Sequence, residues 1–164
     1  MMIRHILLIA MFISYSFPIM YVYNQFLTKD TLSDIICNEE CKNDIIFFMV
    51  IMSIFTILYE FIRNDVESII YISIILISIY GLLQNGVESI YHYIFAILCF
   101  LCIFCFMVHH SYQTNSIILT LLTYFSYCTV LFMILFVQED IIICECLYIL
   151  CFGLFYIYLH FCYK

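Results

Sequence analysis

The chain has 164 residues, of which 67% are hydrophobic and only 10% are charged, and its formal net charge is -7. In soluble domains about a quarter of the residues are charged, and a chain this short cannot bury two thirds of itself in one core. The composition therefore excludes an ordinary soluble domain and indicates a membrane protein. The five basic residues are scattered, so they form no patch for a phosphate backbone, and no nucleic-acid partner is expected.

Six apolar stretches follow one another along the chain. Each is close to the roughly 17–25 helical residues that cross the hydrocarbon core of a bilayer. The sequence thus predicts an all-α fold, a single polytopic transmembrane bundle of six helices with a short acidic lumenal loop after the first. The first stretch has an alternative interpretation as a cleaved signal peptide, because a basic residue precedes its apolar run. The stretches cover about residues 6–26, 45–62, 66–83, 91–108, 116–137 and 141–163.

One substantial polar segment, residues 27–44, separates the first two predicted spans. It is long enough to form a small cap over a helix bundle. Two of its cysteines could be joined by a disulfide bond if the segment faces an oxidising lumen. The other eight cysteines lie in apolar stretches, where a thiol behaves as a small hydrophobic side chain. The candidate functional residues of the segment are Asp34, Glu39 and Glu40, and its candidate disulfide joins Cys37 and Cys41.

The basic residues also predict an orientation. If both termini are cytosolic, Arg4, Arg63 and Lys164 lie on the cytosolic side, while Lys29 and Lys42 lie with most of the acidic residues in the lumen. The positive-inside rule favours this arrangement.

Two similar strings, NDVESIIY from Asn64 and NGVESIYH from Asn85, are interpreted as helix starts. Asn and Asp can cap the free amides of a first helical turn, and a Glu in that turn suits the positive end of the helix dipole. On this interpretation each string begins a new membrane span.

The second predicted span carries Ser53, Thr56 and Glu60 on one helical face, which we call the polar seam. Such a face can form hydrogen bonds to neighbouring helices. Glu60 can also form an ion pair with Arg63 at the end of the span. A third interpretation is that the polar seam lines a path for ions.

His92 begins the fourth predicted span, and Glu145 lies one turn into the sixth. In an alternating arrangement they are at similar depths on the lumenal side. An ionisable residue within a span is costly and usually faces a partner inside the bundle. We therefore expect His92 and Glu145 to be hydrogen-bonded, either as a structural pair or as a site that handles a headgroup or a proton.

The sequence predicts no cofactor. Cys99, Cys102 and Cys105 have a spacing found in metal sites, but they lie in an apolar span without further ligands, so no metal site is expected. His109 and His110, at the end of the same span, suit the negative end of a helix dipole. No nucleotide-binding or hydrolase motif is present in the sequence, which favours a protein that is not an enzyme.

The chain resembles the Frag1/DRAM/Sfk1 family of six-span endomembrane proteins. The likeness covers most of the chain through short motifs, and the prolines and glycine of that family's first loop are missing here. The resemblance implies a Golgi, ER or lysosomal protein that binds lipid, or that assists lipid or GPI-anchor remodelling or autophagy. The residues that carry it are Leu32-Ser33-Asp34, Glu39-Glu40, Arg63, Gly81, His92 and Glu145.

Two other functions remain open from the residues themselves. The chain could form a small oligomeric channel or transporter with the polar seam along its path. It could instead be an accessory subunit whose polar faces bind helices of other membrane proteins.

If His92 and Glu145 meet, removing one partner should cost more than removing both. A lone buried polar group keeps a desolvation penalty of about 1–3 kcal/mol, and a charged group keeps more. We expect His92→Leu or Glu145→Gln alone to lower thermal stability in detergent more than His92→Leu combined with Glu145→Leu. Single effects that simply add in the double variant would show that the two residues do not meet.

Overall fold

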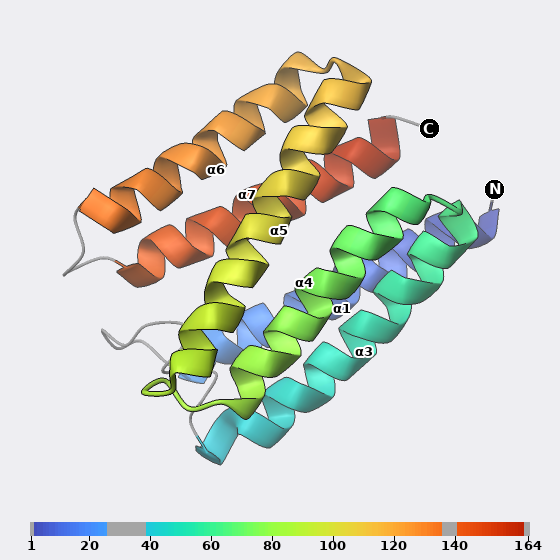
Figure 1. Ribbon diagram of the computed structural model, residues 1–164. Helices are drawn as coiled ribbons and strands as arrows, with labels where there is room; N and C mark the ends of the chain where they lie inside the picture. Colours follow the sequence, from blue (N-terminus) through green and yellow to red (C-terminus); the bar gives the residue numbers. More distant parts are fainter. Residues whose placement is uncertain (1, 26–38, 136–140, 163–164) are drawn as a thin grey trace. The chain divides into compact units, whose positions relative to one another are not determined.

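The computed structural model describes residues 2–25, 39–135 and 141–162. Nearly all of these residues are helical, and they contain no strand, which confirms the predicted all-α fold. Figure 1 shows the six described helices in chain order, and two of the connections between them are short turns. The helices are α1 (Met2–Gln25), α3 (Glu39–Arg63), α4 (Val66–Gln84), α5 (Ile90–Thr114), α6 (Ile117–Leu135) and α7 (Ile141–Cys162).

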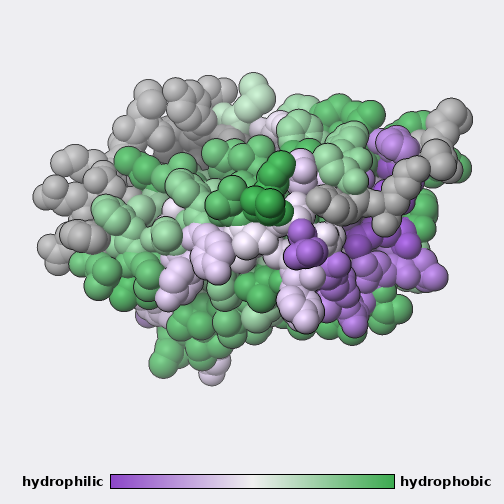
Figure 2. Space-filling view, turned by 90° about the horizontal axis from the view of Figure 1, so that it is seen from above, coloured by the Kyte–Doolittle hydropathy of each residue, from purple (hydrophilic) through white to green (hydrophobic). Residues whose placement is uncertain are grey.

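Five helices contain stretches long and apolar enough to cross a membrane, within α3 to α7. In α1 the apolar stretch that the structure describes, Ile3–Pro18, is shorter than these five. Large apolar side chains are exposed on all six described helices, including Phe12, Phe61, Ile77 and Leu121. Figure 2 shows hydrophobic residues over most of the visible surface, with the hydrophilic residues gathered rather than scattered. Water is a poor solvent for such a surface, so the chain is a multi-pass membrane protein.

The chain divides into two compact units, residues 1–99 and residues 100–164. The first unit contains α1, α3, α4 and the beginning of α5, and the second contains the rest of α5 with α6 and α7. The two units are described separately below.

In the first unit, aromatic and polar contacts hold α1 against α3. The rings of Phe17 and Phe48 are stacked, with centroids 6.1 Å apart and planes 6° from parallel. The hydroxyl of Tyr21 donates a hydrogen bond of 2.9 Å to the Asp44 carboxylate. Nearby, buried Ile45 of α3 and Leu83 of α4 form a small core with Tyr21 packed against it. Three helices therefore meet at this end of the unit.

Two residues turn the chain from α3 into α4. Asn64 has a φ of 58°, in the left-handed region that Asn tolerates better than most residues. Its N–H donates to the carbonyl of Glu60 at 3.0 Å, which closes the end of α3. Asp65 then caps α4 by accepting the N–H of Ser68 at 3.1 Å. The string from Asn64 is a helix start, as predicted.

The similar string from Asn85 behaves differently. α5 begins at Ile90, so Val87 and Glu88 lie in the preceding turn and not in the first helical turn. Ser89 takes the capping role, because its hydroxyl accepts the N–H of Tyr91 at 3.3 Å. The prediction of a helix start at this string was wrong by several residues. Asn85 instead closes α4, since both its backbone N–H and its side-chain amide donate to the carbonyl of Gly81.

In the second unit, the buried ring of Phe106 on α5 lies at the centre of an aromatic cluster. Its centroid is 5.8 to 6.1 Å from those of Phe152, Phe155 and Tyr156 on α7. The hydroxyl of Tyr148, also on α7, donates a hydrogen bond of 2.7 Å to the Phe100 carbonyl of α5. These contacts fix α7 against α5 along several turns.

α6 packs along α7 and is also hydrogen-bonded to α5. The hydroxyls of Thr123 on α6 and Ser111 on α5 share a hydrogen bond of 2.9 Å. The Ser126 hydroxyl of α6 donates to the Met107 thioether of α5 at 3.7 Å. The turn into α6 uses the same left-handed backbone conformation as the turn at Asn64, because Asn115 has a φ of 49°. Small polar side chains thus connect α6 to α5.

Several helix ends differ from the predicted spans. α3 begins at Glu39, so Glu39 and Glu40 lie in its first turn and not in the loop. Acidic residues are favourable at that position because of the helix dipole. α5 continues to Thr114, so the segment around His110, predicted as a connector, is helical. Helices extend beyond the apolar stretch because their backbone remains hydrogen-bonded there.

Gly81 permits a close contact within the first unit. A Cβ added at this position would lie 2.5 Å from the ring of Phe95 on α5, whereas a Cβ at Gly153 of α7 would meet nothing within 4 Å. We expect Gly81→Ala to lower the free energy of unfolding by about 1–2 kcal/mol, because overpacking outweighs the gain in helix propensity. Gly153→Ala, the matched control, should leave stability unchanged or raise it. Equilibrium unfolding in mixed micelles measures both, and equal effects would contradict the contact.

Candidate functional site

Charged and polar side chains gather where α1, α3 and α4 meet at one end of the first unit. We call this group the arginine cluster. It lies around the turn between α3 and α4, within the last turn of one helix and the first turn of the next. Its members are Arg4, Tyr59, Glu60, Arg63, Asp65 and Ser68.

Arg63 is the centre of the arginine cluster. Its Nη1 lies 3.5 Å from the carboxylate of Glu60 and donates to the Ser68 hydroxyl at 3.1 Å. Its Nη2 donates to the carboxylate of Asp65. The Glu60 side chain is 1% exposed and that of Arg63 is 17% exposed. A buried carboxylate is therefore compensated by a guanidinium that also spans the turn.

α1 contributes to the same cluster from the other side. Arg4 lies beside Tyr59, whose side chain is completely buried, and Tyr59 also lies near Glu60 and Arg63. One turn further into α3, Thr56 lies within hydrogen-bonding reach of Tyr15 on α1. The cluster contains two guanidinium groups and two carboxylates, so its formal charges balance. The sequence predicted the pair of Glu60 with Arg63 but gave no sign of the contribution from α1.

The arrangement stabilises the structure without an evident catalytic group. The Arg63 guanidinium is bonded to Glu60, Asp65 and Ser68, and these bonds hold the turn between α3 and α4. Arg4 of α1 lies beside Tyr59 in the same cluster. Charged groups inside a membrane protein are tolerated when they pair in this way.

The other members of the polar seam bond to their own helix. The Ser53 hydroxyl donates to the carbonyl of Met49 and the Thr56 hydroxyl donates to that of Met52, each at 2.7 Å. Bonds of this kind satisfy a hydroxyl without water. Thr56 is fully buried and Ser53 is half-buried.

His92 lies where the sequence predicts, in the first turn of α5, and it is 2% exposed. Its Nδ1 lies 3.2 Å from the carbonyl oxygen of Asn85, so it joins the start of α5 to the end of α4. Glu145 is half-buried on α7. The two residues belong to different units, and their pairing stays a prediction.

The second unit buries two imidazoles beside its aromatic cluster. His110 of α5 lies 4.4 Å from Phe106, and His160 of α7 lies 4.1 Å from Tyr156, measured between ring centroids. The rings of Phe106 and Tyr156 are themselves 5.9 Å apart and nearly parallel, at 23°. Each imidazole thus lies one helical turn beyond a stacked ring. Sequence reasoning missed His160, although it continues the buried face of α7 at helical spacing after Tyr156.

No group of three His, Cys, Asp or Glu side chains that could hold a metal ion occurs within the part of the chain that the structure describes. Within the described part of the chain, Cys99, Cys102 and Cys105 form no disulfide bond. Asp34 and Cys37 lie outside the described residues, as do the side chains of Glu39, Glu40 and Cys41.

Comparisons of the chain with protein-family models, with curated proteins and with solved structures found no match.

The arginine cluster predicts strong coupling between Glu60 and Arg63. Removing one partner of a buried ion pair leaves an uncompensated charge and typically costs about 3–5 kcal/mol, whereas replacing both with apolar residues costs much less. We expect Arg63→Met alone to destabilise the protein more than Arg63→Met combined with Glu60→Leu, measured by equilibrium unfolding in mixed micelles. Glu88→Gln, in the exposed turn before α5, is the control and should have little effect. Additive effects at residues 60 and 63 would refute the coupling.

Proposed function

We propose that this chain is a multi-pass protein of endomembranes that binds lipid and assists lipid or GPI-anchor remodelling or a membrane step of autophagy. The observation that carries the proposal is a shallow, open apolar depression along the outer face of α7, which we call the α7 hollow. The apolar side chains that line it fit a hydrocarbon chain. The resemblance of the sequence to the Frag1/DRAM/Sfk1 family adds support.

The α7 hollow has a volume of about 250 Å³ and opens to the surroundings. It is lined by Ile143, Cys146, Leu147 and Leu150, four residues at helical spacing. The opposite face of α7 is buried and includes Tyr148. Acyl chains are the apolar molecules that a membrane supplies at highest concentration, so a lipid tail is the ligand best suited to this surface.

The polar seam favours this function over ion conduction. A conducting path needs polar groups directed toward water or the ion. The hydroxyls of Ser53 and Thr56 are instead bonded to their own backbone, and Glu60 is buried beside Arg63. The hydroxyl and carboxylate oxygens of the polar seam are therefore bonded within the protein.

We further propose that both termini are cytosolic and that the membrane is that of the ER, Golgi or lysosome. Arg4 and Arg63 come together at one end of the first unit, and basic residues favour the cytosolic side. The acidic segment that includes Asp34 then faces the lumen. Digestion from the cytosolic side of a tag inserted near Lys29, in sealed microsomes, would contradict this orientation.

The chain has no tryptophan, so single-tryptophan variants report lipid contact without background. Leu150 in the α7 hollow and Leu154 outside it are similarly exposed, at 54% and 47%, while Phe155 is fully buried. We expect brominated acyl chains to quench Leu150→Trp most strongly and with a preference for one headgroup class. Leu154→Trp should follow the bulk lipid composition, and Phe155→Trp should be quenched least.

Equal quenching of Leu150→Trp and Leu154→Trp, without headgroup preference, would contradict a bound lipid. Proteoliposomes test the competing function directly. Ion flux that depends on the protein and disappears in Glu60→Gln would favour a channel or transporter, whereas the lipid function predicts no such flux.

A further inference from the structure

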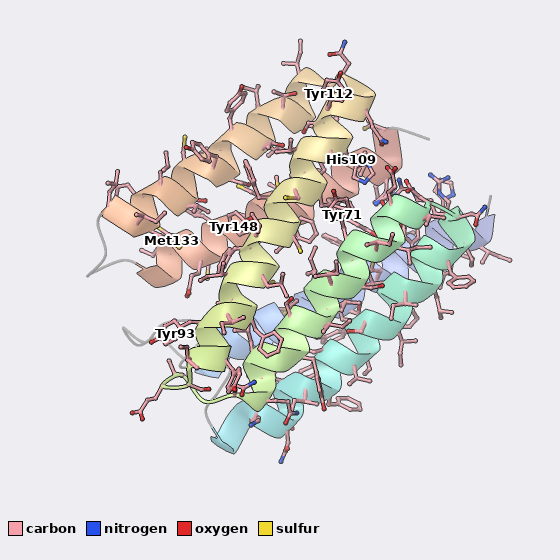
Figure 3. All side chains as sticks on the ribbon, in the orientation of Figure 1. Tyr71, Tyr93, His109, Tyr112, Met133 and Tyr148 are labelled. Carbon is pink, nitrogen blue, oxygen red and sulfur yellow. The ribbon has the colours of Figure 1, made fainter. Side chains whose placement is uncertain are left out.

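The turn between α4 and α5 contains the dipeptide Asn85-Gly86. Because glycine has no Cβ, its backbone nitrogen can approach the side-chain amide of a preceding asparagine closely, and that amide is then open to attack. The two helices are consecutive membrane spans joined by residues 85–89, so the turn lies at the membrane surface, where water is present. Figure 3 shows the turn next to Tyr93, at the beginning of α5.

The closed turn keeps the Asn85 amide from this attack. The side-chain nitrogen of Asn85 donates a hydrogen bond of 2.7 Å to the carbonyl of Gly81, and its backbone N–H donates to the same carbonyl at 3.2 Å. Attack would close a five-membered ring, for which the Gly86 nitrogen must come into line with the Cβ of Asn85. The ψ of 130° at Asn85 turns that nitrogen to a different side. Reaction therefore requires rotation of the backbone at Asn85 and release of its amide.

The same rotation would break the contact between Asn85 and α5. The Asn85 carbonyl oxygen lies 3.2 Å from Nδ1 of His92, and the imidazole is 2% exposed, with the ring of Tyr93 against it at 6.0 Å between centroids. Turning the Gly86 nitrogen toward the side-chain amide also turns this carbonyl away, because both atoms are bonded to the same carbon. Ring closure at Asn85 and the contact with His92 therefore exclude each other.

We propose that Asn85 is a site of spontaneous modification, converted to aspartate or isoaspartate when the α4–α5 turn opens, and that the conversion keeps the turn from closing as before. Hydroxide removes the proton of the Gly86 nitrogen, which attacks the amide carbon of Asn85. A C–N bond forms and the side-chain nitrogen leaves as ammonia. Water then adds to one carbonyl carbon of the cyclic imide and breaks its bond to the ring nitrogen. Overall, an amide and water become a carboxylate and ammonium, with no change of oxidation state.

The product cannot rebuild the contacts of the amide. A carboxylate is only an acceptor, so it cannot donate to the Gly81 carbonyl, and it adds negative charge at the negative end of the α4 dipole. In isoaspartate the main chain also passes through the side-chain carbon, which displaces the carbonyl that contacts His92. One opening that leads to reaction is therefore recorded as a lasting change in the turn.

The rate of conversion at Asn85 tests the gating by the turn. The full chain in lipid bilayers is incubated at mildly alkaline pH, and peptide mapping by mass spectrometry measures aspartate and isoaspartate. We expect conversion at least about tenfold slower than in the chain unfolded by urea and denaturing detergent, because reaction follows the population of the open turn. His92→Phe keeps a ring but removes the nitrogen contact, and should raise the rate roughly threefold to tenfold, the range for one hydrogen bond. Gly86→Ala should suppress conversion in both states.

Asn64 and Asn115, at the other two turns, are the internal controls. Opening of the α4–α5 turn alone in His92→Phe accelerates conversion only at Asn85, whereas unfolding of the whole variant accelerates all three, and the product variant Asn85→Asp then decides. Equal rates at Asn85 in the folded and unfolded chains, or an unchanged rate in a folded His92→Phe, would overturn the proposal.

Asn85→Asp carries the product directly. Its amide hydrogens in residues 81–92 should exchange roughly threefold to tenfold faster than those of the parent protein, the range for one lost hydrogen bond, while those of α6 exchange at the parent rate. Gly86→Ala is the matched control, because a Cβ there meets nothing within 4 Å and Gly86 does not have a positive φ. Unchanged exchange in Asn85→Asp, or an equal increase in α6, would refute the release of the turn.

Discussion

The hydrocarbon core of a membrane offers polar groups no partner except the protein itself, and the other features of this chain depend on that constraint. Hydroxyl groups inside the helices bond backward to their own backbone, as Ser53, Ser78 and Thr120 do to the carbonyls four residues earlier. The ion pairs of Arg63 are placed at a helix end, where its guanidinium lies between the carboxylates of Glu60 and Asp65.

The sequence predicts the fold well because a lipid solvent makes the length of an apolar stretch the dominant signal. The apolar parts of α3, α4, α6 and α7 lie within three residues of the predicted stretches at both ends, whereas that of α5 extends six residues beyond its predicted end. Helix ends were predicted less well. α3 starts at Glu39 and α5 runs to Thr114, because polar residues at a membrane surface do not stop a helix whose backbone bonds continue. The two similar strings also differ, since a cap at Asp65 starts a helix while Asn85 ends one.

The candidate site was predictable only where its residues are neighbours in the sequence. Glu60 and Arg63 are three positions apart on a helix, and their spacing alone predicts the ion pair that the structure contains. Arg4 comes from a helix at the other end of the first unit's sequence, and no local pattern reports that α1 packs against α3. His92 shows the same limit, because its bond to the Asn85 carbonyl depends on the shape of a turn. His160 was missed because a single imidazole in an apolar stretch has no distinguishing spacing.

The turn at Asn64 and Asp65 has a consequence for how the chain is made. Arg63 is bonded to Glu60, Asp65 and Ser68. These three bonds connect residues of one hairpin, α3 with α4, and need no residue from a later helix. A newly made hairpin then enters the bilayer with the carboxylate of Glu60 already neutralised, which removes much of the cost of inserting it.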